Sequence, residues 1–102
     1  MGTTGSRYGA GMIRRRAVVS GYVQGVYFRE SCRQKAAVLS VAGWVRNRSD
    51  RTVEMVFEGE QPAVERMIDW TRRGPEDAHV TGVEVFEEEP EGLVGFAVLP
   101  TR

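Results

Sequence analysis

The sequence has little that would direct it to nucleic acid, to a membrane or to an oxidising compartment. Fourteen Lys plus Arg residues balance fourteen Asp plus Glu residues, and this zero net charge argues against non-specific nucleic-acid binding. No apolar run approaches the ~20 residues of a membrane span, and the N-terminus lacks the apolar segment of a signal peptide. The single cysteine, Cys32, excludes an internal disulfide. We therefore predict a cytoplasmic protein that binds neither nucleic acid nor membrane.

Several common site motifs are missing as well. The chain has no Gly-x-x-x-x-Gly-Lys-Ser/Thr nucleotide loop, no Cys-x-x-Cys, no His-Glu-x-x-His and no Gly-x-Ser-x-Gly, and it lacks the stacking aromatics of RNA-binding domains. The one histidine, His79, is expected at the surface. Cys32 lies on the inner face of a predicted helix, where we expect an inert core thiol. These absences favour a site without metal, cofactor or thiol nucleophile.

The patterning predicts one domain at residues 12–102 after a flexible leader at residues 1–11. The leader is rich in Gly, Thr and Ser and has no periodicity, and the 102 residues of the chain suffice for one modest core. Beyond the leader, apolar residues alternate or recur at helical spacing. These patterns predict strands at 13–20, 44–48, 53–58, 80–87 and 94–98, a helix at 28–39, and a helix from Gln61-Pro62 to a stop at Gly74-Pro75.

The order β-α-β-β-α-β with a short final strand predicts an α+β fold of the ferredoxin-like, split βαβ type. In this fold two helices cover one face of a mainly antiparallel sheet. Strand 53–58 places apolar Val53, Met55 and Phe57 at alternate positions and is expected to be half-buried. The first two strands flank a crossover, so they should run parallel. The loop after the first strand should then meet Asn47, near the end of the second. Small size and the lack of an apolar stripe predict a monomer.

Residues 21–29 are the most informative part of the chain. Their glycines form a loop that opens the helix at 28–39, where free backbone N–H groups converge and the helix dipole favours negative charge. Arg29 falls in the first helical turn, and helical side chains lean toward the N-terminus, so its guanidinium should lie back over the loop. A cation is disfavoured there unless a bound anion offsets it. The loop and Arg29 therefore predict a pocket for a phosphate-like group.

The pattern Gly-x-Val-Gln-Gly-Val-x-Phe-Arg at 21–29, followed by Gly-Trp-Val-Arg-Asn at 43–47, resembles the acylphosphatase family. The likeness runs from about residue 13 to the C-terminus. It implies hydrolysis of an acyl phosphate, a small-molecule carboxylic–phosphoric anhydride, to carboxylate and phosphate, without cofactor or metal. It implies that Arg29 neutralises the phosphoryl charge and that Asn47 orients the attacking water. It also implies a phosphate-binding loop made of Val23, Gln24, Gly25, Val26, Tyr27, Phe28 and Arg29.

Two other functions stay open at this point. One is a non-catalytic module that binds phosphate or acyl phosphate, because the same fold and loop occur as a domain of a larger hydrogenase-maturation protein. The other is a small-ligand regulatory domain of ferredoxin-like fold, which would not require Arg29 and Asn47 together. If replacing Arg29 abolishes phosphate binding, the regulatory domain is disfavoured relative to the acylphosphatase and the binding module.

The chain departs from the family pattern at two positions that usually hold glycine, Ser40 and Arg51. If the backbone has a positive φ there, each residue is strained by about 1 kcal/mol. Neither position should touch the phosphate, so we expect the cost to fall on stability and turn shape. Tyr27 fills a variable position that is often smaller. Together with Tyr22 and Phe28 it is a candidate for shaping the acyl side of the pocket.

Overall fold

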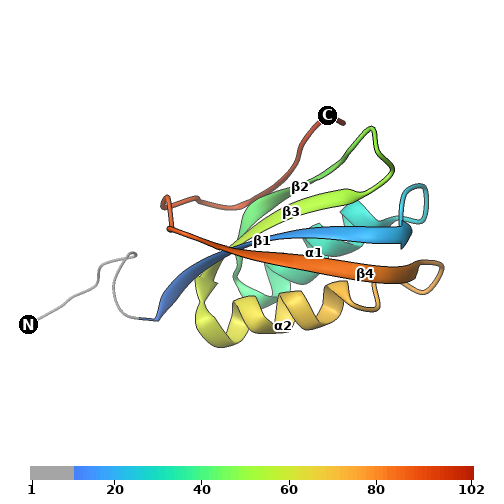
Figure 1. Cartoon of the computed structure of the whole chain (residues 1–102). Helices are drawn as coiled ribbons and strands as arrows, with labels where there is room; N and C mark the ends of the chain where they lie inside the picture. Colours follow the sequence, from blue (N-terminus) through green and yellow to red (C-terminus); the bar gives the residue numbers. More distant parts are fainter. Residues whose placement is uncertain (1–10) are drawn as a thin grey trace, which may run out of the picture.

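The computed structural model describes residues 11–102 and shows two helices packed on one five-stranded sheet (Figure 1). The predicted leader at residues 1–11 falls, apart from Gly11, outside the described residues, and the domain boundary at residue 12 stays a prediction. Within the described range, no helix is long and apolar enough to cross a membrane. The elements are β1 (Met12–Tyr22), α1 (Phe28–Leu39), β2 (Ala42–Asn47), β3 (Val53–Glu60), α2 (Gln61–Thr71), β4 (His79–Glu88) and β5 (Phe96–Val98).

The strands lie in the order β4-β1-β3-β2-β5. Strand β1 pairs antiparallel with β3 and β4, whereas β2 pairs antiparallel with β3 and parallel with β5. Since β1 and β2 are both antiparallel to β3, they run in the same direction and end at the same edge of the sheet. Both helices lie on one face (Figure 1). The predicted ferredoxin-like α+β fold is therefore confirmed, and the loop after β1 reaches the end of β2.

The core lies between the two helices and the sheet face that they cover. Helix α1 buries Phe28, Cys32 and Ala36, at the near-helical spacing seen in the sequence. Burial raises the pKa of the Cys32 thiol far above its ordinary value, which keeps the thiol protonated and agrees with an inert role. Helix α2 buries the face that the sequence predicted, namely Val64, Met67, Ile68 and Thr71.

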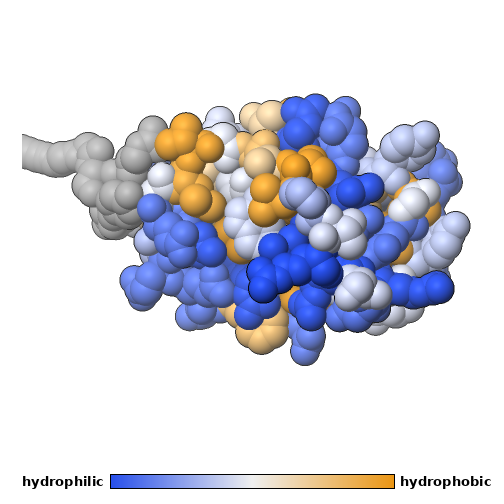
Figure 2. Space-filling view, turned by 90° about the horizontal axis from the view of Figure 1, so that it is seen from above, coloured by the Kyte–Doolittle hydropathy of each residue, from blue (hydrophilic) through white to orange (hydrophobic). Residues whose placement is uncertain are grey.

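The prediction of a half-buried β3 is wrong, because β3 is buried on both faces from Val53 to Gly59. On the face away from the helices, Glu54 accepts a hydrogen bond from Arg46, and Glu58 accepts one from Arg14. Figure 2 views the molecule from this side, and hydrophilic side chains gather at the middle of the face between hydrophobic ones. Charged side chains that pair across strands are therefore buried at positions where alternation alone predicts exposure to water.

Several element boundaries also differ from the predicted ones. Strand β1 extends beyond 13–20, because its pairing with β4 continues past a bulge at Ser20/Gly21. Strand β2 covers 42–47 instead of 44–48, and β5 begins at Phe96 instead of 94. Helix α2 ends at Thr71, after which two backbone amides donate to carbonyls three residues back, in a tightened last turn.

Ser40 and Arg51 both adopt the left-handed backbone conformation that glycine favours. Ser40 caps the C-terminus of α1 with φ 57°, and Arg51 lies in the β2–β3 turn with φ 76°. Both positions thus have the positive φ on which the predicted strain depends, at a cost of about 1 kcal/mol each. Neither side chain lines the pocket described below. The strain therefore bears on the stability of two turns.

Candidate active site

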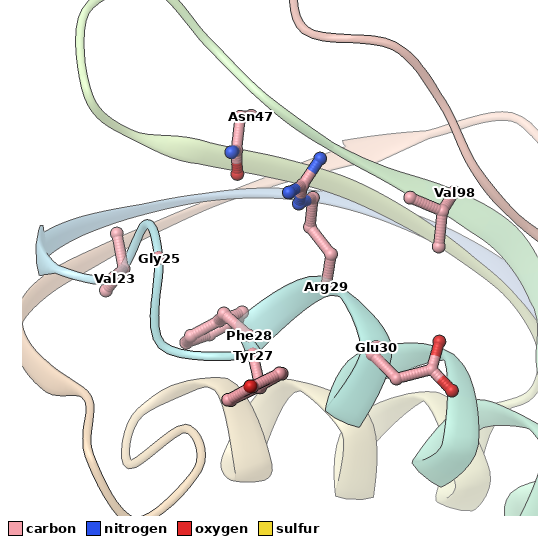
Figure 3. Close-up of a pocket in the computed structure, with 8 residues that line it drawn as sticks. All are labelled: Val23, Gly25, Tyr27, Phe28, Arg29, Glu30, Asn47 and Val98. Carbon is pink, nitrogen blue, oxygen red and sulfur yellow. The ribbon is translucent and has the colours of Figure 1, made fainter.

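A pocket of about 530 Å³ lies at the sheet edge where the β1–α1 loop meets the end of β2 (Figure 3). This volume is within the range of small-ligand sites, about 300–1,000 Å³. The structure therefore brings Arg29 and Asn47 together from separate elements, as the parallel arrangement of β1 and β2 predicts. The lining residues are Val23, Gly25, Tyr27, Phe28, Arg29, Glu30, Asn47 and Val98.

The loop between β1 and α1 is held in the core on both sides of Gly25. The side chains of Val23 and Val26 are buried, whereas Gly25 is exposed with φ 76° and has open space where a Cβ would lie. Glycine is thus needed at position 25 for backbone conformation and not for packing. Val26, which was predicted as part of the phosphate loop, contributes its side chain to the core and not to the pocket lining.

Gln24 ties the loop to the hairpin that carries Asn47. Its side-chain amide nitrogen donates to the Arg48 carbonyl at 2.8 Å and to the Thr52 carbonyl at 2.9 Å. Both N–H groups are therefore used, and both acceptors belong to the turn between β2 and β3. This side chain fixes the loop relative to the end of β2. The sequence placed Gln24 in the loop, but it gave no sign of partners so distant along the chain.

The N-terminus of α1 presents backbone donors to the pocket. Tyr27 is the N-cap residue, and it makes no side-chain capping hydrogen bond. The first amides of an α-helix have no carbonyl partner within the helix, and this end of the helix carries a partial positive charge. An anion in the pocket would therefore meet free N–H groups and a favourable dipole.

Arg29 extends from the first turn of α1 toward the end of β2, and Figure 3 shows its guanidinium near Asn47. The residue is half-buried. It makes no ion pair or hydrogen bond within residues 11–102, whereas Arg33, one turn further on, is paired with Glu30. Among the described residues, Arg29 is also the one cation that lines the pocket. Its five N–H donors are therefore free to hold the oxygens of an anion.

Asn47 is the last residue of β2, and its backbone is fixed by the C-terminal segment. The Asn47 carbonyl accepts a hydrogen bond from the Arg102 amide at 3.0 Å. The side-chain Oδ1 is the one buried side-chain N or O atom within residues 11–102 that has no hydrogen-bond partner. Leaving such an atom unpaired costs about 1–3 kcal/mol, and native structures rarely do so. Asn47 also lines the pocket, so its side-chain amide lies beside the space that a water or ligand would occupy.

The sequence did not predict Glu30 or Val98 as pocket residues. Hydrogen bonds from Arg33 and Gln34 lower the pKa of Glu30 to about 2, so this carboxylate is ionised and tied to the outer side of α1. Val98 comes from β5, which lies beside β2 through parallel pairing. Its one signal in the sequence was membership of a short apolar strand, which does not reveal proximity to the loop.

The aromatic residues near the loop take three different positions. Tyr22 is exposed and does not line the pocket, so its expected place beside the acyl group is not found. Phe28 lines the pocket but is buried against Trp70, with ring centroids 5.1 Å apart, and is mainly a core residue. Tyr27 lines the pocket and is 80% exposed.

No group of three His, Cys, Asp or Glu side chains in the described part of the chain is arranged to hold a metal ion. His79, the one histidine, is exposed at the start of β4 and lies outside the pocket lining. Apart from the Glu30 carboxylate and the Tyr27 hydroxyl, the polar groups that line the pocket are one cation, one amide and backbone N–H groups. This donor set suits the binding of an oxyanion and the positioning of a water.

The fold and the pocket define a small α+β domain with an anion site at a loop–helix junction, and comparison with known proteins places it among relatives. The acylphosphatase family model matches residues 15–98. An acylphosphatase of Gloeobacter violaceus is 53% identical over 87 residues, which cover 85% of this chain and 94% of the relative. The chain belongs to the acylphosphatase family.

Solved structures show the same relationship. An acylphosphatase from Coxiella burnetii superposes with a TM-score of 0.84 at 39% identity, covering 87% of this chain and 94% of that one. A full-length HypF in a phosphate- and nucleotide-bound form matches with a TM-score of 0.82 at 25% identity, and the match covers 88% of this chain but 12% of HypF. The domain architecture is thus found both alone and within a much larger chain.

Proposed function

We propose that this protein is an acylphosphatase that hydrolyses the carboxyl–phosphate bond of acyl phosphates to carboxylate and inorganic phosphate. The observation that carries the proposal is the meeting of an unpaired Arg29 with the buried, unpartnered Oδ1 of Asn47 at an uncapped helix N-terminus. The guanidinium suits a phosphoryl group, the amide oxygen suits a water, and the helix N-terminus adds backbone donors. Family membership supports the same reaction.

In the proposed reaction the backbone amides of the 23–29 loop and the guanidinium of Arg29 hold the phosphoryl oxygens. The Oδ1 atom of Asn47 accepts a hydrogen bond from a water and directs the water oxygen toward phosphorus, in line with the bond to the acyl group. The water oxygen–phosphorus bond forms, the phosphorus–acyl oxygen bond breaks, and the electron pair of the broken bond leaves with the carboxylate. One proton of the water passes to a phosphoryl oxygen of the substrate, and the other stays on the oxygen now bonded to phosphorus.

This chemistry needs few protein groups because the leaving group is already good. A carboxylate leaves without protonation, so no general acid is required, and phosphoryl transfer is catalysed mainly by positioning and electrostatic stabilisation. The proposal includes a monomer that acts on a small acyl phosphate without metal or cofactor. A phosphate monoester would lack the good leaving group, and its hydrolysis would need an acid that the pocket does not offer.

The direct test is hydrolysis of benzoyl phosphate, followed by ultraviolet absorbance in the presence of EDTA, with the alkyl ester glycerol 3-phosphate, followed by phosphate release, as the comparison substrate. We expect rapid turnover of benzoyl phosphate, unchanged by EDTA, and little turnover of the ester. A folded protein that binds inorganic phosphate but turns over neither compound would instead support the non-catalytic binding module. Loss of turnover on adding EDTA would contradict the metal-independent mechanism.

Replacing Asn47 by alanine should separate catalysis from binding. We expect kcat to fall roughly 10²–10³-fold, the loss typical of removing one positioned polar group. The inhibition constant of inorganic phosphate should change less than threefold, because the loop and Arg29 are intact. The free energy of unfolding should not decrease, because the variant removes a buried acceptor that has no partner. Steady-state kinetics and urea unfolding check both parts, and a parallel loss of phosphate binding would contradict the assigned role.

A further inference from the structure

Tyr27 holds an unusual conformation at the mouth of the pocket. Its backbone is left-handed, with φ 63°, yet its side chain is 80% exposed and makes no capping bond to α1. A bulky residue at positive φ is an outlier that the surrounding structure must impose. Such outliers gather at functional sites. Neither core packing nor helix capping explains why a tyrosine holds this conformation.

The geometry of in-line attack indicates where the acyl group must lie. In Figure 3, Asn47, on the β2 side, and Tyr27, at the start of α1, lie at opposite ends of the group of lining residues, with Arg29 beside them. If Asn47 holds the attacking water, then the leaving group departs from the opposite side of phosphorus. That direction leads away from β2 toward the outer end of the loop. The ring of Tyr27 lies on this side.

The pocket has space and surface for an organic group beyond the phosphate. Its volume is about 530 Å³, whereas a single water molecule takes about 30 Å³ in the liquid. A phosphoryl group, which has only a few heavy atoms, therefore leaves most of the pocket open. Val98 adds an apolar side chain that is 42% exposed. The other charged lining residue, Glu30, is a carboxylate paired with Arg33.

We propose that Tyr27 is the specificity-determining residue for the acyl group, and that the site prefers acyl phosphates whose acyl group is aromatic. This inference rests on the proposed acylphosphatase function. The exposed ring of Tyr27 stacks against the aromatic acyl group. A small aliphatic acyl group, such as acetyl, has no ring to stack on Tyr27, so it gains much less binding free energy from this side chain.

The test compares kcat/KM for benzoyl phosphate and acetyl phosphate in the wild type, Tyr27→Phe and Tyr27→Asn. Asparagine tolerates the left-handed conformation, so the loop backbone should be kept while the ring is lost. We expect Tyr27→Asn to reduce the ratio of benzoyl to acetyl kcat/KM by about five- to tenfold, the size of one aromatic pair, mainly through KM. Tyr27→Phe should retain the wild-type ratio. Comparing ratios between variants cancels the different intrinsic reactivities of the two substrates.

Tyr22→Thr is the matched control, because Tyr22 is also an exposed tyrosine but lies outside the pocket lining. Its ratio should equal that of the wild type. An equal loss for both substrates in Tyr27→Asn would show that Tyr27 shapes only the loop, and an unchanged ratio would show that it has no role in selection. Either result overturns the inference. Failure of the wild type on both substrates would instead overturn the proposed function.

Discussion

Replacing Arg29 by alanine is expected to lower kcat/KM for benzoyl phosphate by more than about 10³-fold. Removing a single neutral donor at a charged transition state costs about 10²–10³ in rate, and Arg29 supplies both donors and the one positive charge that residues 11–102 place in the pocket lining. Phosphate binding should fall together with turnover, in contrast to the effect of changing Asn47. Steady-state kinetics and inhibition by inorganic phosphate measure the two effects.

The same substitution should leave the fold intact or stabilise it slightly. Within the described residues Arg29 forms no ion pair or hydrogen bond, and a cation in the first turn opposes the helix dipole by about 0.3–1 kcal/mol. The expected combination is therefore a large loss of activity with no loss in the free energy of unfolding. That combination marks a residue kept for function at a small cost in stability.

Two further variants make this prediction specific. Arg29→Lys keeps the charge but loses the planar fork of donors, so its activity should lie between those of the wild type and Arg29→Ala. Lys35→Ala removes an exposed cation from the same helix, outside the pocket, and should retain full activity. If Arg29→Ala kept activity within tenfold of the wild type, then the phosphoryl charge would be held elsewhere and the assigned role would be wrong.

Local patterns in the sequence predicted the parts of the structure that local physics decides. Helix α1 covers the predicted residues 28–39, and the inner face of α2 is the predicted set. The positive φ at Ser40 and Arg51 could be anticipated because each stands at a turn where glycine is usual. The meeting of Arg29 and Asn47 followed from the crossover between β1 and β2, which constrains where two distant segments end.

What the sequence could not predict depends on partners far along the chain. The two acceptors of Gln24 lie in a different hairpin, and Val98 reaches the pocket through the pairing of β5 with β2. Alternation predicted that Glu54 and Glu58 face water, since burial of a carboxylate is decided by whether cations lie opposite. The strain at Tyr27 also went unpredicted, because its position in the sequence pattern tolerates many residue types.

The burial of Glu58 shows how the uncovered sheet face is held together. Glu58 is 3% exposed and accepts a 2.7 Å hydrogen bond from Arg14, which itself also donates to Glu88. Glu58 further accepts hydrogen bonds from the backbone amides of residues 91, 92 and 93. It therefore joins β1 and β3 to the segment that leads into β5. Since β5 carries Val98, this one carboxylate also supports a wall of the pocket.

Replacing Glu58 by alanine is expected to destabilise the protein by about 3–5 kcal/mol, the usual cost of removing one partner of a buried ion pair. Arg14 would keep its bond to Glu88, so we expect a value near the lower limit. Three backbone amides would lose their acceptor at the same time. A loss of this size is a large share of the roughly 5–15 kcal/mol typical of a domain. Urea unfolding at neutral pH measures it.

The pH dependence of the free energy of unfolding tests the stabilising role of the Glu58 carboxylate independently. Burial alone would raise the pKa of Glu58, but hydrogen bonds from Arg14 and from the backbone amides of Glu91 and Leu93 outweigh it and hold the pKa below its ordinary value of 4.5. A depressed pKa in the folded state means that the stabilisation is complete above about pH 4.5 and is lost as the pH falls through the folded-state value. Glu58→Gln should therefore be less stable than the wild type at pH 7, with a smaller further loss on acidification.

Glu87→Gln is the matched control for this prediction. The Glu87 side chain is 83% exposed and lies 3.8 Å from Arg15, so the same chemical change there should alter the free energy of unfolding by less than about 0.5 kcal/mol. Unfolding curves at pH 7 and pH 3 for the wild type and both variants complete the comparison. If Glu58→Gln and Glu87→Gln behaved alike at both pH values, then the buried network would contribute no more than an exposed pair. The uncovered face would in that case owe its stability to the apolar contacts of β3, and the segment before β5 would be held without its carboxylate.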